Sequence, residues 1–193
     1  IHIYFQNHNL RRSNMKKFLT ILLVSLSISA ISQTTINPDT VCANATGEQY
    51  LVAVTPTSTY QWTITGGGGI LQTGQTTSSI TVDWGGVSGL YPNAVEVIES
   101  NAAGCPGTPQ LLDVFILDLS GNTIGPFCPG DPTTPLVGSP AGGTWSGTGV
   151  VGSNFQPSTG VGNYVLTYSM AGCNTTINVT VNNGPITGPI QHF

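Results

Sequence analysis

Four cysteines have the clearest chemical use in this chain, and they stand in two similar groups. Each group has an early Cys, a central Trp and a late Cys behind a Gly: Cys42, Trp62 and Cys105, then Cys128, Trp145 and Cys173. Four cysteines allow three disulfide pairings. The repeat favours Cys42 with Cys105 and Cys128 with Cys173, each bridge stabilising its repeat by about 4 kcal/mol. Four free thiols are the alternative, and a metal site is disfavoured because there is no C-x-x-C spacing and no nearby His.

Three aromatic residues could bind a ligand. If Trp84, Tyr91 and Phe155 are exposed, their rings could stack on sugars and form a carbohydrate-binding face. Packing in the core or at a sheet edge is the favoured alternative for all three. The central Trp62 and Trp145 are expected in the core.

Two groups of carboxylates invite a catalytic or metal-binding interpretation. Glu96 and Glu99 could be the acid and base of a glycosidase, but on a strand their odd separation puts them on opposite faces. Asp118, Ser120 and Asn122 form a fragment of a Ca²⁺ loop that lacks the closing acidic residue. A solvated loop is therefore favoured, and we predict no metal site, no catalytic residue and no cofactor.

The charges are divided along the chain in a way that excludes most chemistry. All four basic residues precede position 18, all eight acidic residues follow position 38, and between 18 and 191 there is no Lys, Arg or His. A Ser or Cys nucleophile usually needs an adjacent base such as His, and phosphoryl transfer needs Lys or Arg. Nucleic acid binds through cations that neutralise its phosphates. The sequence therefore predicts neither an enzyme nor a nucleic-acid-binding protein.

The first 32 residues are predicted to be an export signal with a few residues before it. Met15, Lys16 and Lys17 precede the apolar run 18–31, which is too short to span a bilayer. We expect translation to start at Met15 and cleavage to occur before Gln33. The mature chain is then secreted or displayed at the cell surface and has no membrane span.

After the signal, short apolar or Thr-rich runs alternate with turn-forming clusters, which predicts an all-β protein. Tyr60, Trp62 and Ile64 alternate with polar residues, as in a half-buried strand. No stretch has a convincing helical period. The expected strands cover residues 49–54, 59–65, 79–84, 94–99, 111–117, 143–146, 163–168 and 175–181.

The spacing of strands, cysteines and tryptophans predicts two tandem immunoglobulin-like β-sandwich domains. A Trp between two bridged cysteines on opposite sheets is the core arrangement of that fold. The first domain is placed at 33–119 and a second, smaller one at 120–183. Residues 184–193 look like a linker or the start of a further repeat, so we expect the natural chain to continue.

Particular motifs also resemble known families. Residues 39–44, Tyr50 and residues 60–62, 74–84 and 104–105 resemble the PKD-like domains of secreted surface proteins from Bacteroidota. Residues 140–150 (PAGGTWSGTGV) and 155–157 resemble a repeat of long gliding-motility and adhesin-type proteins of that phylum. The resemblance covers about 37–182. It implies a non-catalytic, disulfide-bridged repeat, exported by the Sec system and often carried to the surface by type IX secretion, although no C-terminal sorting domain is visible.

These observations leave two functional hypotheses. The favoured one is a structural or adhesive module of a cell-surface repeat protein whose ligand, glycan or protein, is not identified by the sequence. The alternative is a carbohydrate-binding accessory module of a secreted glycan-degrading enzyme.

Overall fold

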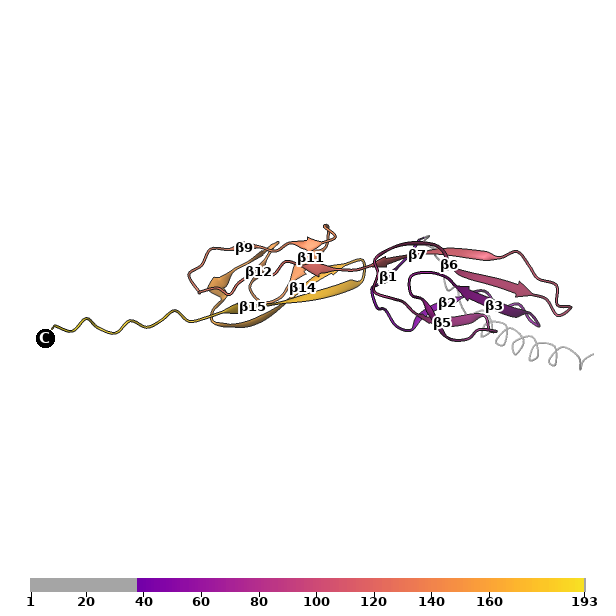
Figure 1. Cartoon of the computed structure of the whole chain (residues 1–193), viewed down its shortest axis with the longest axis horizontal. Helices are drawn as coiled ribbons and strands as arrows, with labels where there is room; N and C mark the ends of the chain where they lie inside the picture. Colours follow the sequence, from indigo (N-terminus) through magenta and orange to yellow (C-terminus); the bar gives the residue numbers. More distant parts are fainter. Residues whose placement is uncertain (1–37, 193) are drawn as a thin grey trace, which may run out of the picture. The chain divides into compact units, whose positions relative to one another are not determined.

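Residues 38–192 of the computed structural model form two β-sandwiches in chain order (Figure 1). The all-β prediction is confirmed, since the one helical element in this range is a single 3-10 turn, η1, at Pro157–Thr159. The predicted signal peptide, with the residues before it, lies outside the described residues. Residues 38–192 belong to one compact unit.

The first sandwich consists of two sheets. One has the strand order β1-β7-β6-β3, and the other β2-β5-β4. β1 runs parallel to β7, whereas the other neighbours are antiparallel. The strands are β1 Asp39–Cys42, β2 Glu48–Leu51, β3 Thr59–Ile64, β4 Ile70–Thr73, β5 Ser79–Asp83, β6 Gly89–Ser100 and β7 Gln110–Leu117.

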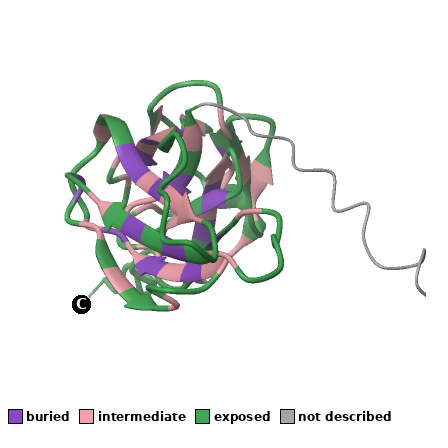
Figure 2. Ribbon diagram, turned by 90° about the vertical axis from the view of Figure 1, so that its right-hand side faces the viewer, coloured by how far each residue is buried: buried purple, intermediate pink, exposed green. Residues whose placement is uncertain are grey.

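The core of this sandwich forms because apolar residues alternate along its strands. Tyr60 and Trp62 are buried and Ile64 is half-buried, with exposed polar residues between them, as predicted. Buried and exposed residues alternate in the same way along other strands (Figure 2). The indole of Trp62 donates a hydrogen bond to the carbonyl of Thr77 (2.8 Å), so its polar atom is satisfied inside the core.

A run of four glycines makes the turn between β3 and β4. Gly66, Gly67 and Gly68 have φ of 72°, 58° and 64°, a region that residues with a Cβ rarely adopt. A Cβ on Gly69 would lie 2.5 Å from Ile64 and 2.7 Å from the ring of Trp84. This glycine run is therefore explained by the tight turn and by its packing on the core.

The second sandwich combines two long strands with several very short ones. Its three sheets have the orders β11-β14-β15, β12-β13-β9 and β10-β8. Phe155, Leu166, Val179 and Val181 are among its buried core residues. The strands are β8 Ser120–Gly121, β9 Thr134–Pro135, β10 Gly138–Ser139, β11 Thr144–Ser146, β12 Val150–Val151, β13 Asn154–Phe155, β14 Gly162–Met170 and β15 Cys173–Val181.

Each of the eight predicted strands overlaps an observed one. β1, β4 and the two-residue strands of the second sandwich were not predicted, because so few residues do not establish a period. Six of the eight strands of the second sandwich have only two or three residues, whereas β14 and β15 have nine each. The domain boundaries 33–119 and 120–183 stay predictions; Asp118 and Leu119 alone separate β7 from β8.

Candidate functional site: a disulfide between the two sandwiches

Cys42 ends the first strand of the first sandwich. In the parallel pairing of β1 with β7 it lies opposite Leu117, the last residue of β7. The pairing continues one step further, since the amide of Ala43 donates to the carbonyl of Leu117 (2.9 Å). Cys42 therefore lies at the carboxyl end of β7, where the chain leaves the first sandwich.

Cys173 begins the last strand of the second sandwich. It is the first residue of β15 and pairs with Met170 across the hairpin that joins β14 to β15. Ala171 and Gly172 make the turn with φ of 50° and 85°. The Cys173 side chain is buried, with 3% of its surface exposed.

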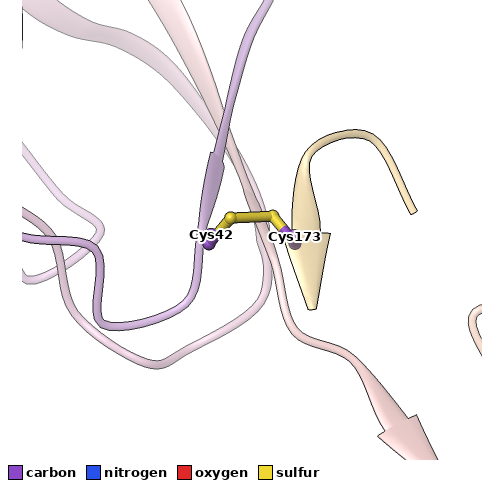
Figure 3. Close-up of a disulfide and its surroundings, with 2 residues drawn as sticks. All are labelled: Cys42 and Cys173. Carbon is purple, nitrogen blue, oxygen red and sulfur yellow. A yellow bond between two sulfur atoms is a disulfide. The ribbon is translucent and has the colours of Figure 1, made fainter. Parts of the chain in front are cut away.

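Cys42 and Cys173 form a disulfide between the two sandwiches (Figure 3). Their Cα atoms are 5.5 Å apart and their sequence separation is 131. The predicted pairing of Cys42 with Cys105 and of Cys128 with Cys173 is therefore wrong.

Strand length explains why each sandwich does not bridge its own cysteines. Cys42 lies at the end of β7, whereas Cys105 precedes its start, and the strand has 8 residues. At 3.3 Å per residue, β7 keeps the two apart by about 25 Å. Cα atoms of bridged cysteines lie within about 7 Å. The same argument separates Cys128 from Cys173, because Phe127 pairs with Val181 at the far end of β15.

A small hydrophobic cluster surrounds the disulfide, and we call it the junction cluster. It contains residues of both sandwiches and of the connection between them. Leu119, from that connection, is 9% exposed, and the rings of Trp145 and Tyr168 are 5.1 Å apart. The junction cluster consists of buried Leu117, Leu119, Tyr168 and Cys173, with Cys42, Phe115, Trp145 and Met170 packed against them.

The glycine-rich motif of residues 140–150 holds Tyr168 in this cluster. The Tyr168 hydroxyl donates to the carbonyl of Pro140 (2.6 Å) and accepts from the amide of Gly143 (2.8 Å). A Cβ on Gly143 would lie 2.5 Å from the Tyr168 ring, and a Cβ on Gly138 would also overlap it. The motif thus packs backbone directly against an aromatic ring of the junction.

Cys105 and Cys128, the other two predicted disulfide residues, are exposed free thiols. Cys105 lies in the hairpin between β6 and β7, where its amide donates to the side chain of Asn101 (3.0 Å). The amide of Cys128 donates to the carboxylate of Asp131 (2.8 Å). They belong to different sandwiches, and no partner for either is found among the described residues.

The aromatic residues proposed to bind sugar lie mainly inside the cores. Trp84 is 4% exposed and Phe155 is fully buried, so their assignment as ligand-facing residues is wrong. Tyr91 is half-buried, and its hydroxyl donates to the carbonyl of Val87 (2.9 Å). Of the two expected core tryptophans, Trp62 is buried and Trp145 is partly buried. The Nε1 atom of Trp145 has no hydrogen-bond partner among residues 38–192.

A buried tyrosine connects the first strand to Trp84. The Tyr50 hydroxyl accepts a hydrogen bond from Trp84 Nε1 (3.0 Å) and donates one to Asp39 Oδ2 (3.2 Å). Burial, followed by the negative charge of Asp39, raises the pKa of Tyr50 well above its ordinary value. This hydroxyl is therefore a structural group that stays protonated at neutral pH.

Glu99 and Asn122, two of the residues considered for chemistry, make other contacts. Glu96 and Glu99 both lie on β6, an odd number of residues apart and hence on opposite faces. Hydrogen bonds from the side chains of Ser58 and Thr55 lower the pKa of Glu99. Asn122 Oδ1, from the suggested Ca²⁺ loop, accepts from the amide of Val137 (2.7 Å) and so holds β8 to β10.

Within residues 38–192, no group of three or more His, Cys, Asp and Glu side chains comes together that could hold a metal ion. In the same range, no helix is long and apolar enough to cross a membrane.

Comparison with known proteins gives one family match, which overlaps the first sandwich. Residues 27–113 match the PKD-like domain family. The match and the observed sandwich agree on a PKD-like, immunoglobulin-type domain in this part of the chain. Such domains with a disulfide are typical of extracellular proteins, because disulfides persist in oxidising compartments. No curated protein matches the chain at a significant level.

Several solved structures are similar to the chain at low sequence identity. The I-band fragment of titin is 11% identical, with a TM-score of 0.32, over 77% of this chain and 63% of that one. Extracellular domains 3–5 of Drosophila OTK are 13% identical (TM-score 0.36; 77% and 60% covered). The insect immune protein hemolin is 12% identical (TM-score 0.36; 79% and 46% covered). This chain thus covers less than two thirds of each of these structures.

Proposed function

We propose that the chain is a non-catalytic, extracellular, load-bearing module of a bacterial cell-surface repeat protein, exported through a signal peptide that ends before Gln33. Its two domains are 33–119 and 120–183. The observation that carries the proposal is the Cys42–Cys173 disulfide, which gives mechanical force a covalent path around most of the chain.

The strand order favours resistance to pulling. The chain enters the first sandwich through β1 and leaves it through β7, and these two strands run parallel. Without the disulfide, pulling the ends apart would slide β1 along β7, and the hydrogen bonds along the pair, from Asp39 to Cys42, would be loaded together rather than one after another. With the disulfide in place, force passes from Cys42 to Cys173 and does not load β7.

The disulfide shortens the path that force can take. Force applied before Asp39 reaches Cys42 at the end of β1, crosses to Cys173 and leaves along β15 past Val181. The backbone between the two cysteines lies outside this path and cannot be drawn out. At about 3.3–3.6 Å per residue, a sequence separation of 131 corresponds to about 450 Å of protected extension.

The charge pattern fits an external spacer rather than a catalyst. The mature chain carries a formal charge of about −8 and no Lys or Arg. Net charge of one sign keeps a secreted module soluble. The mature chain also has no Lys or Arg to stabilise a developing anion, and its one His is at position 192.

The carbohydrate-binding alternative has less support. It depended on exposed aromatic rings, and the rings of Trp84 and Phe155 are buried. Saturable binding of the intact mature chain to one sugar on a glycan array would favour that alternative. Binding to cells or inert surfaces without competition from sugars would instead add an adhesive role to the structural one.

Force spectroscopy on the oxidised mature chain, held at its two ends, tests the proposal. We expect the tether that holds the intact chain to break or detach before the length of the chain increases by hundreds of ångströms. The Cys42→Ser/Cys173→Ser variant, as the control, should lengthen by about 450 Å in two steps, one for each sandwich. Release of that length by the oxidised wild-type chain would contradict a load-bearing role.

A further inference from the structure

The two free thiols occupy the same structural positions as the two bonded ones. The bonded pair joins the early Cys of one sandwich to the late Cys of the sandwich that follows. Cys128 is the early Cys of the second sandwich, and Cys105 is the late Cys of the first. Each chain therefore has one unpaired early Cys, Cys128, and one unpaired late Cys, Cys105.

Cys128 corresponds to Cys42 in three respects. Each stands at a parallel contact with the last strand of its sandwich: Cys42 opposite Leu117, and Cys128 directly after Phe127, which pairs with Val181. In both cases the partner is the final residue of that strand. Each Cys carbonyl also accepts a hydrogen bond at 3.0 Å from the amide three residues later, in a tight turn.

Cys105 corresponds to Cys173 in a similar way. Each lies in the hairpin that joins the last two strands of its sandwich, β6 to β7 and β14 to β15. Each directly follows a glycine with positive φ, 80° at Gly104 and 85° at Gly172. Both cysteines thus lie near the end at which the last strand begins: Cys173 is the first residue of β15, and Cys105 comes five residues before β7.

We propose that copies of this chain join head to tail through a disulfide between Cys128 of one copy and Cys105 of the next. The bond repeats between chains the linkage that Cys42 and Cys173 form within one chain. Because Cys128 and Cys105 lie on different surfaces, the contact is heterologous. Each oligomer therefore keeps a free Cys105 at one end and a free Cys128 at the other. Such contacts build open chains when the rotation does not close a ring.

Bond formation needs an oxidant, and a small-molecule disulfide such as glutathione disulfide balances the reaction. The Cys128 thiolate attacks this disulfide, forms a mixed disulfide and releases one glutathione thiol. The Cys105 thiolate of the next copy then attacks the Cys128 sulfur and releases the second glutathione thiol. Two protein thiols thus become one disulfide, and their two protons are taken up by the two glutathione thiols.

Single variants of the mature chain, incubated with glutathione disulfide, test this pairing. On a non-reducing gel we expect a ladder of oligomers for the wild-type chain. Cys105→Ser alone and Cys128→Ser alone should stay monomeric, whereas their equimolar mixture should form a dimer and nothing larger. In that dimer, peptide mass spectrometry should find Cys128 of one variant bonded to Cys105 of the other.

Three results would overturn the proposal. Each single variant could form homodimers as fast as the mixture forms heterodimers, which would indicate random oxidation. The mixture could stay monomeric, or the wild-type chain could form an internal Cys105–Cys128 bond. Both variants keep Cys42 and Cys173, so failure here leaves the load-bearing proposal, which rests on that bond, unaffected.

Discussion

Removing the disulfide between the sandwiches should cost several kcal/mol of stability. In the unfolded wild-type chain, the disulfide closes a loop over a sequence separation of 131, and the unfolded Cys42→Ser/Cys173→Ser variant lacks this constraint. The chain-entropy relation gives about 5 kcal/mol for a loop of this size. If the second sandwich unfolds alone, the loop runs only from Leu117 to Cys173, and the same relation gives about 4 kcal/mol.

Urea unfolding followed by tryptophan fluorescence measures this loss. With a slope of about 2 kcal/mol per M, the midpoint should fall by about 2 M. The melting temperature should fall by about 10–20 °C. The matched control is Cys105→Ser/Cys128→Ser, which removes two exposed free thiols and should change stability by less than about 0.5 kcal/mol.

The comparison of the two double variants decides between the possible pairings. If each sandwich bridged its own cysteines, both variants would lose both bridges and would be destabilised equally. Equal losses, or a loss below about 1 kcal/mol in Cys42→Ser/Cys173→Ser, would refute the reasoning from strand length.

Three further outcomes follow from the packing. Gly143→Ala should cost about 1–3 kcal/mol in urea unfolding, because its Cβ would lie 2.5 Å from the Tyr168 ring, whereas Gly130→Ala, with open space, should be nearly neutral. Trp84→Ala should lose about 3–5 kcal/mol, because the indole is 4% exposed; a stable variant that lost only sugar binding would contradict this burial. The raised pKa of Tyr50 predicts that its contribution to stability is complete below pH 10 and is lost as the pH rises further, because the unfolded chain then gives up a proton that the folded chain retains. Melting temperatures at pH 8–11 should therefore fall less steeply for Tyr50→Phe than for the wild-type chain, and parallel curves would contradict the assignment.

Much of the fold could be predicted from the sequence because the alternation of residue types is local. In β3, the side chains of Tyr60 and Trp62 reach the core while their neighbours are exposed, and a period of two is enough to predict this. The strands that were not predicted have only two to four residues, which is too few to show an alternation of apolar and polar residues. β1 is the important case, because its parallel pairing with β7 decides where Cys42 lies.

The disulfide could not be predicted from the repeat alone. The matching order of Cys and Trp in the two halves indicates two similar sandwiches, but it does not tell which ends of each sandwich the cysteines occupy. The early Cys lies at the end of a parallel contact with the last strand, and the late Cys lies at or before the start of that strand. Recognising β1 as a parallel partner of β7 would have placed Cys42 and Cys105 at opposite ends.

The presence of an aromatic residue also did not show whether its side chain lies in the core or on the surface. Trp84 directly follows β5, and its amide donates to the carbonyl of Ala45 (2.8 Å), which turns the indole toward the hydroxyl of Tyr50. Phe155 ends a two-residue strand and packs between Phe127 and Tyr164, with both ring distances at 5.7 Å. Both burials depend on contacts with distant residues, which no local pattern records.

A disulfide map of the oxidised mature chain tests the central claim most directly. Trypsin cannot be used because the mature chain has no Lys or Arg, but cleavage after aromatic residues such as Tyr50, Phe115 and Trp145 puts each cysteine on its own peptide. The predicted result is one linked pair that contains Cys42 and Cys173. A peptide that links Cys42 to Cys105 would contradict the account.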